Sequence, residues 1–498
     1  MAEAVSEATA AHLREFVATE LGLHFPPERQ QDLLRGLASA AGEFGFRDLE
    51  SGVEWLLSAP LTPAQTEILA SHLTVGETYF FRDGNLFDAL EIQVFPELFA
   101  ARRATGQRLR LWSAGCCTGE EPYSIAILLH RLLPDLAAWN VTLLATDINV
   151  RFLRKAKAGV YTEWSFRDCP APLKTRYFRQ LPGKQFEILP EVKRLVTFAY
   201  LNLAKDVFPS LLNNTNAMDL ILCRNVLMYF APAKAAHVAE ALQDALVADG
   251  WLAVSPSEAS HSLFSRLRTM NYPGTILYRK GRVDTTAKPS PAPLECSTFG
   301  LTEAVPEPEP ETWFPAFKAV EAPAGAPRQA ATVTLEAAEE FYHHGRYEEA
   351  RQAALAYHAD HPGAAAAMEL LARVHANQGD LAGALAWCGR ALAADRLDPS
   401  CHYLQAMILQ ETGELEEAAA SLRLALYLDP DHILAHFALG DLARRQRRGQ
   451  EAQRQWRNAL TLLAKVPGET PLAEADGLTA GRLTEILRSA MEQEALHG

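Results

Sequence analysis

The chain has 498 residues, 48% of them hydrophobic and 22% charged, which predicts about three globular domains and excludes a disulfide-stapled miniprotein. Its 47 basic and 61 acidic residues give a formal net charge of -14, which disfavours binding to nucleic acid or to anionic membrane surfaces. The seven cysteines form no C-x-x-C pair, and neither an N-terminal signal pattern nor a run of about 18 apolar residues occurs. We therefore expect a cytoplasmic protein with reduced thiols, no metal site, no nucleic-acid partner and no direct membrane insertion.

Helical patterns fill the chain up to about residue 104, and short apolar runs then alternate with segments of helix length. The runs lie near residues 109–115, 141–148, 195–203, 218–225 and 250–258. Strands that alternate with helices predict a doubly wound, mostly parallel sheet. We expect an N-terminal helical subdomain over 1–85 and a Rossmann-like α/β domain over 86–282. Ligands of such sheets bind beyond the carboxyl ends of the strands, so the residues that follow each run are the candidates for function.

The first of these strand ends is a loop with two glycines that leads into a helix. It contains Gly115 and Gly119, followed by Glu120 and Glu121. The glycines allow the backbone to approach a ligand closely, but the lysine of a phosphate-binding loop is replaced by Glu120. Carboxylates at this position suit a positively charged ligand such as S-adenosylmethionine. Alternatively, the two glutamates only complement the dipole of the helix that they begin.

Polar residues also follow the next three apolar runs. Asp147 ends the second run, about thirty residues after the glycine loop, and an acid there can accept hydrogen bonds from both hydroxyls of a ribose. A helix-capping role is the alternative for Asp147. Asn202 and Leu203 stand at the end of the third run, and residues 224–230 extend from the end of the fourth. Amide and backbone groups at these two ends could bracket an adenine.

A proline-rich stretch separates this region from the rest of the chain. Nine of the 29 prolines fall between Pro289 and Pro327, in a segment without hydrophobic period that we interpret as a linker over 283–330. We expect few contacts to cross this linker, because each side has its own core.

The remaining sequence consists of internal repeats. Alanines at 350, 384, 418 and 452 are evenly spaced, and Gly345, Gly379 and Gly413 have the same spacing. A period of about 34 residues predicts stacked helix-turn-helix units, with the glycines in the turns. These units resemble tetratricopeptide repeats, about four of them within 331–467, and a closing helix is expected over 468–498. Arg447 stands where the fourth turn glycine is expected.

Four segments of the chain before the linker together resemble a known enzyme family. The segments LTVGETYFFRD (73–83), SAGCCTGEEPYSIA (113–126), ATDIN (145–149) and LCRNVLMYF (222–230) look like those of chemotaxis receptor methyltransferases of the CheR type. The resemblance implies an S-adenosylmethionine-dependent methyltransferase domain with a small antiparallel flap near 159–196. It also implies an activity that esterifies glutamate side chains on the signalling helices of methyl-accepting receptors.

Carried over to this sequence, the resemblance assigns the methionine end of the cofactor to Thr78, Arg82 and Glu121. Arg82 is the candidate to hold a carboxylate, since a guanidinium binds such groups in a bidentate manner. Gly76 stands where many members of the family have Asn, so we count no ligand there.

For the rest of the cofactor, the resemblance assigns the ribose hydroxyls to Asp147 and the adenine to Asn202 and Leu203. It implies that Arg224 and Asn225 line the cleft. Tyr229 would face the methyl group and orient the substrate; its alternative role is that of a core aromatic residue.

Two other functions remain open from the sequence. One keeps the cofactor but transfers the methyl group to another acceptor, and the other is a scaffold that senses S-adenosylmethionine without catalysis. In each case the repeats are expected to recruit a protein partner, whose identity the sequence does not give.

Overall fold

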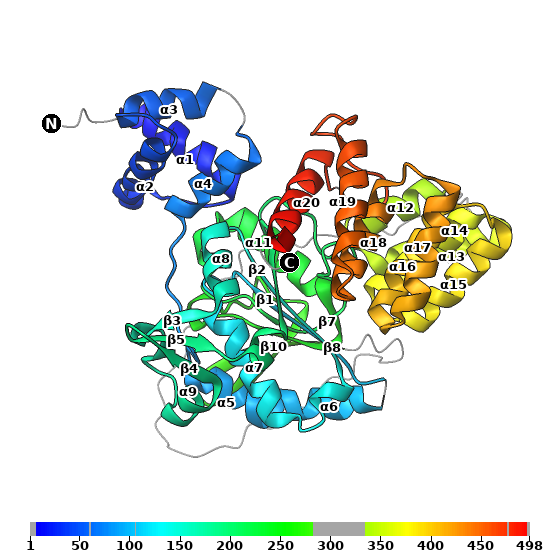
Figure 1. Ribbon diagram of the computed structural model, residues 1–498, viewed down its shortest axis with the longest axis horizontal. Coiled ribbons are helices and arrows are strands. Elements are labelled where there is room, and N and C mark those ends of the chain that lie inside the picture. The colour runs from blue at the N-terminus through cyan, green and yellow to red at the C-terminus, as the bar shows by residue number, and fades with distance from the viewer. Residues whose placement is uncertain (1–5, 59–60, 105, 282–333, 476–477, 496–498) are drawn as a thin grey trace, which may run out of the picture.

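The computed structural model describes residues 6–58, 61–104, 106–281, 334–475 and 478–495. It contains a small helical subdomain, a central sheet with helices and a flap, and a stack of helical repeats (Figure 1). The expected fold class, an N-terminal helical subdomain and a Rossmann-like α/β domain followed by an all-α repeat solenoid, is confirmed. The expected linker over 283–330 lies outside the described residues.

The N-terminal subdomain consists of four helices around one apolar core. They are α1 (Glu7–Leu21), α2 (Gln30–Glu43), α3 (Leu49–Ser58) and α4 (Pro63–Leu73). Ser6 caps α1 by accepting a hydrogen bond from the Thr9 N–H, and Thr62 and Gln65 form a reciprocal capping box at α4. Buried side chains recur at helical spacing on each helix, for example Leu13, Val17 and Leu21 on α1, and this spacing directs one face of each helix inward.

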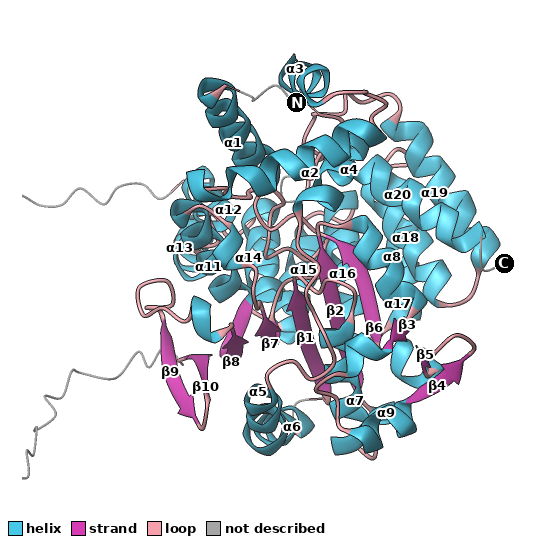
Figure 2. Ribbon diagram, turned by 90° about the vertical axis from the view of Figure 1, so that its left-hand side faces the viewer, coloured by secondary structure: helices cyan, strands magenta, loops and turns pink. Residues whose placement is uncertain are grey.

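The central sheet has seven strands in the order β6-β2-β1-β7-β8-β10-β9. Five run parallel: β1 (Arg108–Ala114), β2 (Asn140–Asp147), β6 (Val196–Tyr200), β7 (Met218–Leu222) and β8 (Leu246–Ala253). The antiparallel hairpin of β9 (Leu267–Tyr272) and β10 (Thr275–Lys280) extends one edge (Figure 2). Strands β1, β7 and β8 are almost entirely buried, as expected for a sheet that is covered on both faces.

Side chains along the strands point alternately to the two faces of the sheet, where they pack into two separate cores. Leu111 and Leu143 point into a core with helices α5 (Gly84–Ala89), α6 (Phe95–Arg103) and α7 (Glu120–Leu132). Trp112 and Leu144 point into the other core, which α11 (Pro232–Ala245) and the segment after β6 complete. A single π-helical turn over Leu90–Val94 joins α5 to α6, and α8 (Val150–Ala158) follows β2.

A three-stranded antiparallel sheet lies within residues 159–196. Its strands, in spatial order, are β3 (Val160–Thr162), β5 (Gln185–Ile188) and β4 (Phe178–Leu181), with the short helices α9 (Ala171–Tyr177) and α10 (Pro190–Lys193) beside them. Phe80, Phe166 and Phe178 pack ring against ring beneath it. This is the small flap that the resemblance implies.

Eight helices form four antiparallel pairs in the C-terminal region. The first helices of the pairs are α12 (Leu335–His343), α14 (Ala365–Asn377), α16 (Pro399–Thr412) and α18 (Ile433–Arg445); the second are α13 (Tyr347–Asp360), α15 (Leu381–Ala394), α17 (Leu415–Leu428) and α19 (Gly449–Leu463). Gly345, Gly379 and Gly413 have φ of 70°, 82° and 88°, and Arg447 takes the same left-handed conformation at 60°. The fourth repeat thus keeps the turn geometry without its glycine.

The closing helix is shorter than expected. α20 (Ala480–Ala495) packs Leu483 and Leu487 against the last repeat, whereas residues 468–475 form a loop before it.

The repeats pack directly against the sheet domain, so the expectation of few contacts across the linker is wrong (Figure 1). The carboxylate of Glu411 on α16 pairs with Arg108 and Arg110 of β1. Burial opposes ionisation of Glu411, but these two guanidinium groups hold its pKa below the usual value. Sequence periodicity shows that the repeats stack on one another; it contains no signal for a surface that they share with a distant strand.

Candidate active site

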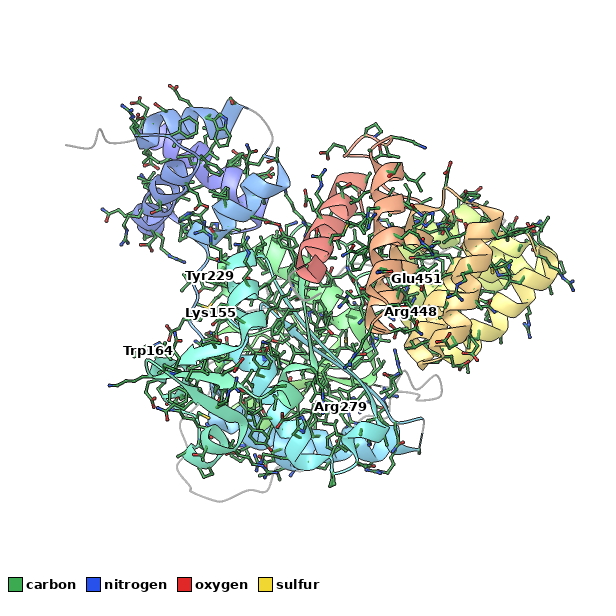
Figure 3. The ribbon with its side chains drawn as sticks, in the orientation of Figure 1. Lys155, Trp164, Tyr229, Arg279, Arg448 and Glu451 are labelled. Atoms are coloured by element: carbon green, nitrogen blue, oxygen red, sulfur yellow. The ribbon has the colours of Figure 1, made fainter. Side chains whose placement is uncertain are left out.

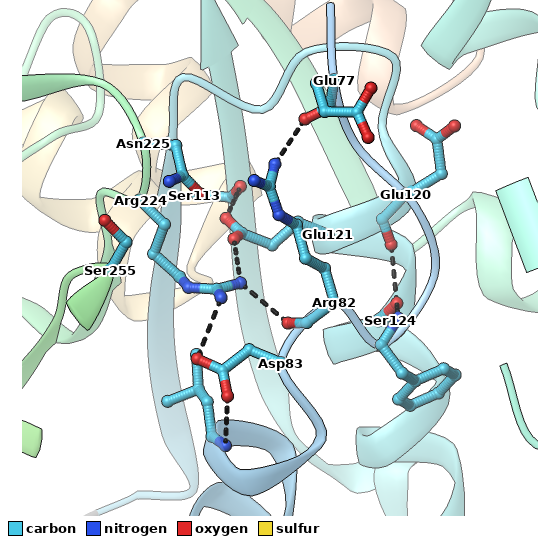
Figure 4. Close-up of polar contacts among 12 residues, drawn as sticks. Glu77, Arg82, Asp83, Ser113, Glu120, Glu121, Ser124, Arg224, Asn225 and Ser255 are labelled. Atoms are coloured by element: carbon cyan, nitrogen blue, oxygen red, sulfur yellow. Dashed lines mark hydrogen bonds and ion pairs between the residues drawn. The ribbon is translucent and has the colours of Figure 1, made fainter. Parts of the chain in front are cut away.

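Arg224 organises a cluster of charged groups at the carboxyl ends of β1 and β7. Its Nη1 donates to the Arg82 carbonyl at 3.0 Å and lies 3.3 Å from Glu121 Oε2, while Nη2 lies 3.2 Å from Asp83 Oδ2 (Figure 4). The side chain of Arg224 is 4% exposed, and its Nε is buried without a hydrogen-bond partner among the described residues. A buried donor without a partner is costly, so this atom marks a place where a ligand could bind.

The two glutamates after Gly119 have different surroundings. Glu121 accepts a hydrogen bond of 2.7 Å from Ser113 at the end of β1 and faces Arg224. Glu120 is 1% exposed and accepts from Thr118 and Ser165, so it ties the loop to the flap. Both glutamates are thus held within the protein, Glu121 in the Arg224 cluster and Glu120 between the loop and the flap; the Glu121 side chain is 12% exposed.

Asp147 lies at the end of β2, beside the glycine loop. Its two carboxylate oxygens accept hydrogen bonds of 2.8 Å from the N–H groups of Cys117 and Asn149. Burial raises the pKa of Asp147 to about 6, although these backbone donors oppose the shift. Each oxygen keeps a second lone pair, so Asp147 can still accept hydrogen bonds from a ligand.

The glycine loop packs so closely against its neighbours that a side chain would not fit at Gly115. Gly115 has φ of 80°, and a Cβ there would lie 2.3 Å from Val226 Cγ2. Burial raises the pKa of the Cys116 and Cys117 thiols well above the usual value, so both are neutral and unsuited to nucleophilic chemistry. The loop supplies shape and backbone N–H groups.

Residues 74–83 lead from the N-terminal helices to the sheet domain and end at the Arg224 cluster. Arg82 Nη1 donates to the Glu77 carbonyl, and Thr78 is partly exposed on the same segment. At Gly76 a Cβ would lie 2.6 Å from the ring of Phe152 on α8. The Phe152 ring therefore occupies the space that a side chain at position 76 would need, which explains the glycine in physical terms.

Asn202 and Leu203 follow β6 and are both buried. The Asn202 side chain accepts a hydrogen bond from the Ala204 N–H, and its backbone N–H donates to Asp206 at 2.6 Å. Asn202 thus fixes a tight turn at the third strand end. This turn lies at the edge of β6, one strand beyond Asp147 in the sheet.

Asn225 takes the left-handed conformation, with φ of 56°, directly after Arg224. Glu258 holds this turn by accepting hydrogen bonds from the N–H groups of Asn225, Val226 and Met228. Glu258 lies in a short turn after β8, where its carboxylate also accepts a hydrogen bond from the Ser255 N–H.

Tyr229 lies apart from the Arg224 cluster. Its side chain packs against the core of the N-terminal helices, and its carbonyl accepts a hydrogen bond of 2.7 Å from the His24 N–H. Figure 3 places it at the end of the sheet domain that faces these helices. Tyr229 therefore stands at the junction of the two parts.

The sequence reasoning missed three residues of this arrangement: Asp83, Ser113 and Glu258. Each acts on a residue that was predicted, since Asp83 pairs with Arg224, Ser113 holds Glu121, and Glu258 holds the turn at Asn225. Asp83 and Ser113 lie within the quoted segments and Glu258 ends the fifth apolar run, so their positions were a signal. Among the described residues, no group of three or more side chains is placed to hold a metal ion.

Comparison with known proteins identifies the families that the two main regions match. Residues 76–274 match the family model described as "CheR methyltransferase, SAM binding domain", and residues 335–399 and 399–432 match models of the tetratricopeptide repeat. A "Chemotaxis protein methyltransferase" of Borreliella burgdorferi is 30% identical over 250 residues, which cover 50% of this chain and 87% of the relative.

A second relative matches across both regions. The "Probable biofilm formation methyltransferase WspC" of Pseudomonas aeruginosa is 28% identical over 433 residues, covering 84% of this chain and 94% of the relative. Among solved structures, a thermophilic TPR protein of Thermus thermophilus is similar over 32% of this chain and 79% of its own, with a TM-score of 0.27 and 20% identity.

Proposed function

Since the chain belongs to the chemotaxis protein methyltransferase family and carries C-terminal tetratricopeptide repeats, we propose that it methylates glutamate side chains on methyl-accepting receptors. The cluster that Arg224 gathers is the observation that carries this proposal, because it puts acidic and basic groups together at the carboxyl ends of β1 and β7. The cofactor of the family domain is S-adenosylmethionine.

The residues present fit this cofactor. The unpartnered Nε of Arg224 and the spare lone pairs of Asp147 are suited to a ligand that both accepts and donates hydrogen bonds. The carboxylates of Glu121 and Asp83 suit an ammonium group. In the proposed assignment, Thr78, Arg82 and Glu121 hold the amino-acid end, with Arg224 and Asn225 lining the cleft.

The nucleoside end of the cofactor is assigned to the neighbouring strands. Asp147 would accept the ribose hydroxyls, and Asn202 and Leu203 would flank the adenine. The order of strands β7, β1, β2 and β6 supports this assignment, because it lines up Arg224, Glu121, Asp147 and Asn202 along one edge of the sheet.

When bound, S-adenosylmethionine supplies a methyl group on a positively charged sulfur, which a carboxylate oxygen can accept as the carbon–sulfur bond breaks. A substrate glutamate with a pKa of about 4.3 is already ionised at neutral pH, so the protein need not supply a general base. The remaining tasks are positioning and exclusion of water. We assign positioning of the acceptor to Arg82, on the 74–83 segment, and to Tyr229, at the junction with the N-terminal helices.

We also propose that the enzyme acts in the cytoplasm, where the signalling helices of such receptors lie, and that its repeats bind a protein partner. No described helix is long and apolar enough to cross a membrane. Support for a partner comes from apolar side chains on the repeats that face solvent: Leu397 is 73% exposed and Tyr427 is 81% exposed.

A methylation assay tests the proposed function. The full chain is incubated with methyl-labelled S-adenosylmethionine and membranes that contain its cognate receptor, and the label on the receptor is treated with base. Base-labile label that disappears with the Asp147→Ala variant supports glutamate esterification. Base-stable label would show another acceptor, and cofactor binding without any transfer would show a sensing scaffold.

A further inference from the structure

The connection between β6 and β7 lacks the helix that such a crossover usually contains. Residues 201–217 join two parallel strands, and the structure describes all of them without a helix or a strand. Parallel strands are normally linked through an α-helix, and a long irregular segment in a compact domain needs other elements to hold it. We call residues 201–217 the crossover segment.

The inner side of the crossover segment packs on the sheet. Phe208 contacts Trp112 of β1, with ring centroids 5.5 Å apart, and Leu201 and Leu203 join the same core. The outer side is a turn closed by Ser210 and Thr215, whose backbone and side chains exchange hydrogen bonds of 3.0 and 3.1 Å. These two hydrogen bonds close the turn, so it can carry apolar side chains into another part of the protein.

Leu211 and Leu212 project from this turn into the repeats. Leu211 packs in the core of the second and third repeats, and Leu212 packs against the core of the third and fourth. The residues around the two leucines come mainly from the first helices of the pairs: Tyr342, Glu369, Arg373, Ser400, Tyr403, Leu404, Met407 and Glu474. The cavity left between them is about 20 Å³, which is room for one water molecule.

Polar contacts fix the same interface beside the leucines. Arg110 of β1 is fully buried, and it donates to the carbonyls of Asn214 and Asn216 while it pairs with Glu411 of α16. Asn216 donates to the carbonyl of Ala376 on α14, at 3.4 Å. Arg110 therefore joins the crossover segment, the sheet and the repeats in one network.

The even spacing of the repeat turns indicates that their interface with the sheet domain is specific. Their turn glycines recur at a constant spacing, and a Cβ at each would approach the sheet domain: Asp244 at 3.0 Å for Gly345, Ala217 at 3.1 Å for Gly379, and Asn140 at 3.6 Å for Gly413. Three successive turns thus meet one surface, which a chance contact of separate domains would not produce.

We propose that the groove formed by the first helices of the repeats is an intramolecular docking site whose occupant is the crossover segment. The groove is filled by this chain, so the repeats replace the missing crossover helix. A protein partner of the repeats must then use another surface or displace Leu211 and Leu212.

Docking also connects the repeats to the cleft. The crossover segment begins at Asn202 and Leu203, whose role at the adenine rests on the proposed function. Arg482 of α20 lies 3.7 Å from the centroid of the Tyr200 ring, directly before this turn. Because both ends of the segment are held by the C-terminal region, undocking should loosen the adenine side of the cleft.

Hydrogen exchange on the full chain tests the docking. The double variant Leu211→Asp, Leu212→Asp places two charges in the groove, and Leu424→Asp on the exposed side of α17 is the matched control. We expect amides of the crossover segment and of α16 to exchange at least tenfold faster in the double variant than in wild type or control. Glu411→Gln changes no apolar packing, and it should give a smaller increase in the exchange rate of the same peptides. This second variant keeps the test valid if the double variant fails to fold.

Calorimetry with S-adenosylhomocysteine on the same proteins tests the link to the cleft. We expect affinity to fall about tenfold in the double variant and to stay unchanged in the control. Unchanged exchange in both the double variant and Glu411→Gln would overturn the docking. Faster exchange with unchanged affinity would overturn the link to the adenine side, whereas absence of binding in wild type would contradict the proposed function itself.

Discussion

At the scale of single residues, Asp147 offers a test with a defined pH range. Its pKa of about 6 in the folded protein lies above the ordinary value of 3.8, because burial disfavours the charged form. Proton binding by Asp147 therefore stabilises the fold at low pH, and this contribution is lost as the pH rises through about 6. Ribose hydroxyls would need the ionised form as acceptor, so cofactor affinity should change in the opposite direction.

We predict that the affinity of the wild-type protein for S-adenosylhomocysteine falls as the pH decreases below about 6, and that Asp147→Asn removes this dependence. At pH 7.5, Asp147→Ala should weaken binding at least tenfold, since each charged hydrogen bond contributes about 1.5 to 3 kcal/mol. Calorimetry across pH 5 to 8 measures both effects. Equal affinity of a folded Asp147→Ala variant and wild type would remove Asp147 from the site.

Glu258 is the second residue whose role can be measured. Glu258→Gln replaces one acceptor oxygen by a donor that faces backbone N–H groups, so it should lower the free energy of unfolding by about 2 to 4 kcal/mol. Chemical denaturation measures this change. The control Glu163→Gln breaks only an exposed pair with Lys174 and should stay within about 0.5 kcal/mol of wild type; similar losses in both variants would contradict the role of Glu258.

Residue types at strand ends were predictable, whereas their partners were not. Asp147 stands at the end of one apolar run and Glu121 lies in the first turn of the helix that follows another, and the strand order then brings them to one edge. Ser113 and Asp83 act through contacts that depend on side-chain direction, which a linear pattern does not contain. Gly76 shows the same limit. The residue that leaves no room for a side chain at position 76 is Phe152, which is distant in the sequence.

At the scale of elements, the turn glycines of the repeats distinguish local from tertiary effects. Gly379→Ala puts a side chain at φ of 82° and 3.1 Å from Ala217, so we expect a loss of about 1 to 2 kcal/mol in stability. Gly389→Ala lies within α15 with open space around it and should instead gain about 0.5 to 1 kcal/mol. Thermal denaturation of the two variants gives the comparison, and a neutral Gly379→Ala would contradict the close approach.

The sequence predicted the repeats by their period and the strands by short apolar runs, because both are local patterns. It did not predict where α20 begins: Glu, Ala and Leu within residues 468–475 favour a helix, whereas Gly468 and Pro471 of the same segment stand in a loop. Nor did it predict that β6 and β7 are joined without a helix. Leu211 and Leu212 look like core residues of a strand or helix, and only the fold shows that their core belongs to the repeats.

At the scale of the whole molecule, the repeats and the sheet domain share buried surface. Removing residues 282–498 would expose Leu211 and Leu212 and leave Arg110 without its Glu411 partner. We therefore predict that a protein ending at residue 281 unfolds at a lower temperature than the full chain and self-associates. Scanning calorimetry and light scattering measure these effects, and substituting both leucines by serine should reduce the association. A truncated protein as stable as the full chain would contradict a shared interface.

The account as a whole requires the cofactor to lie along the strand ends from Arg224 to Asn202. A crystal structure of the full chain with S-adenosylhomocysteine tests this most directly. We predict ribose hydroxyls within hydrogen-bond distance of Asp147, the amino-acid end between Arg82 and Glu121, and the adenine beside Asn202 and Leu203. A ligand bound elsewhere, or one whose ribose does not contact Asp147, would contradict the account.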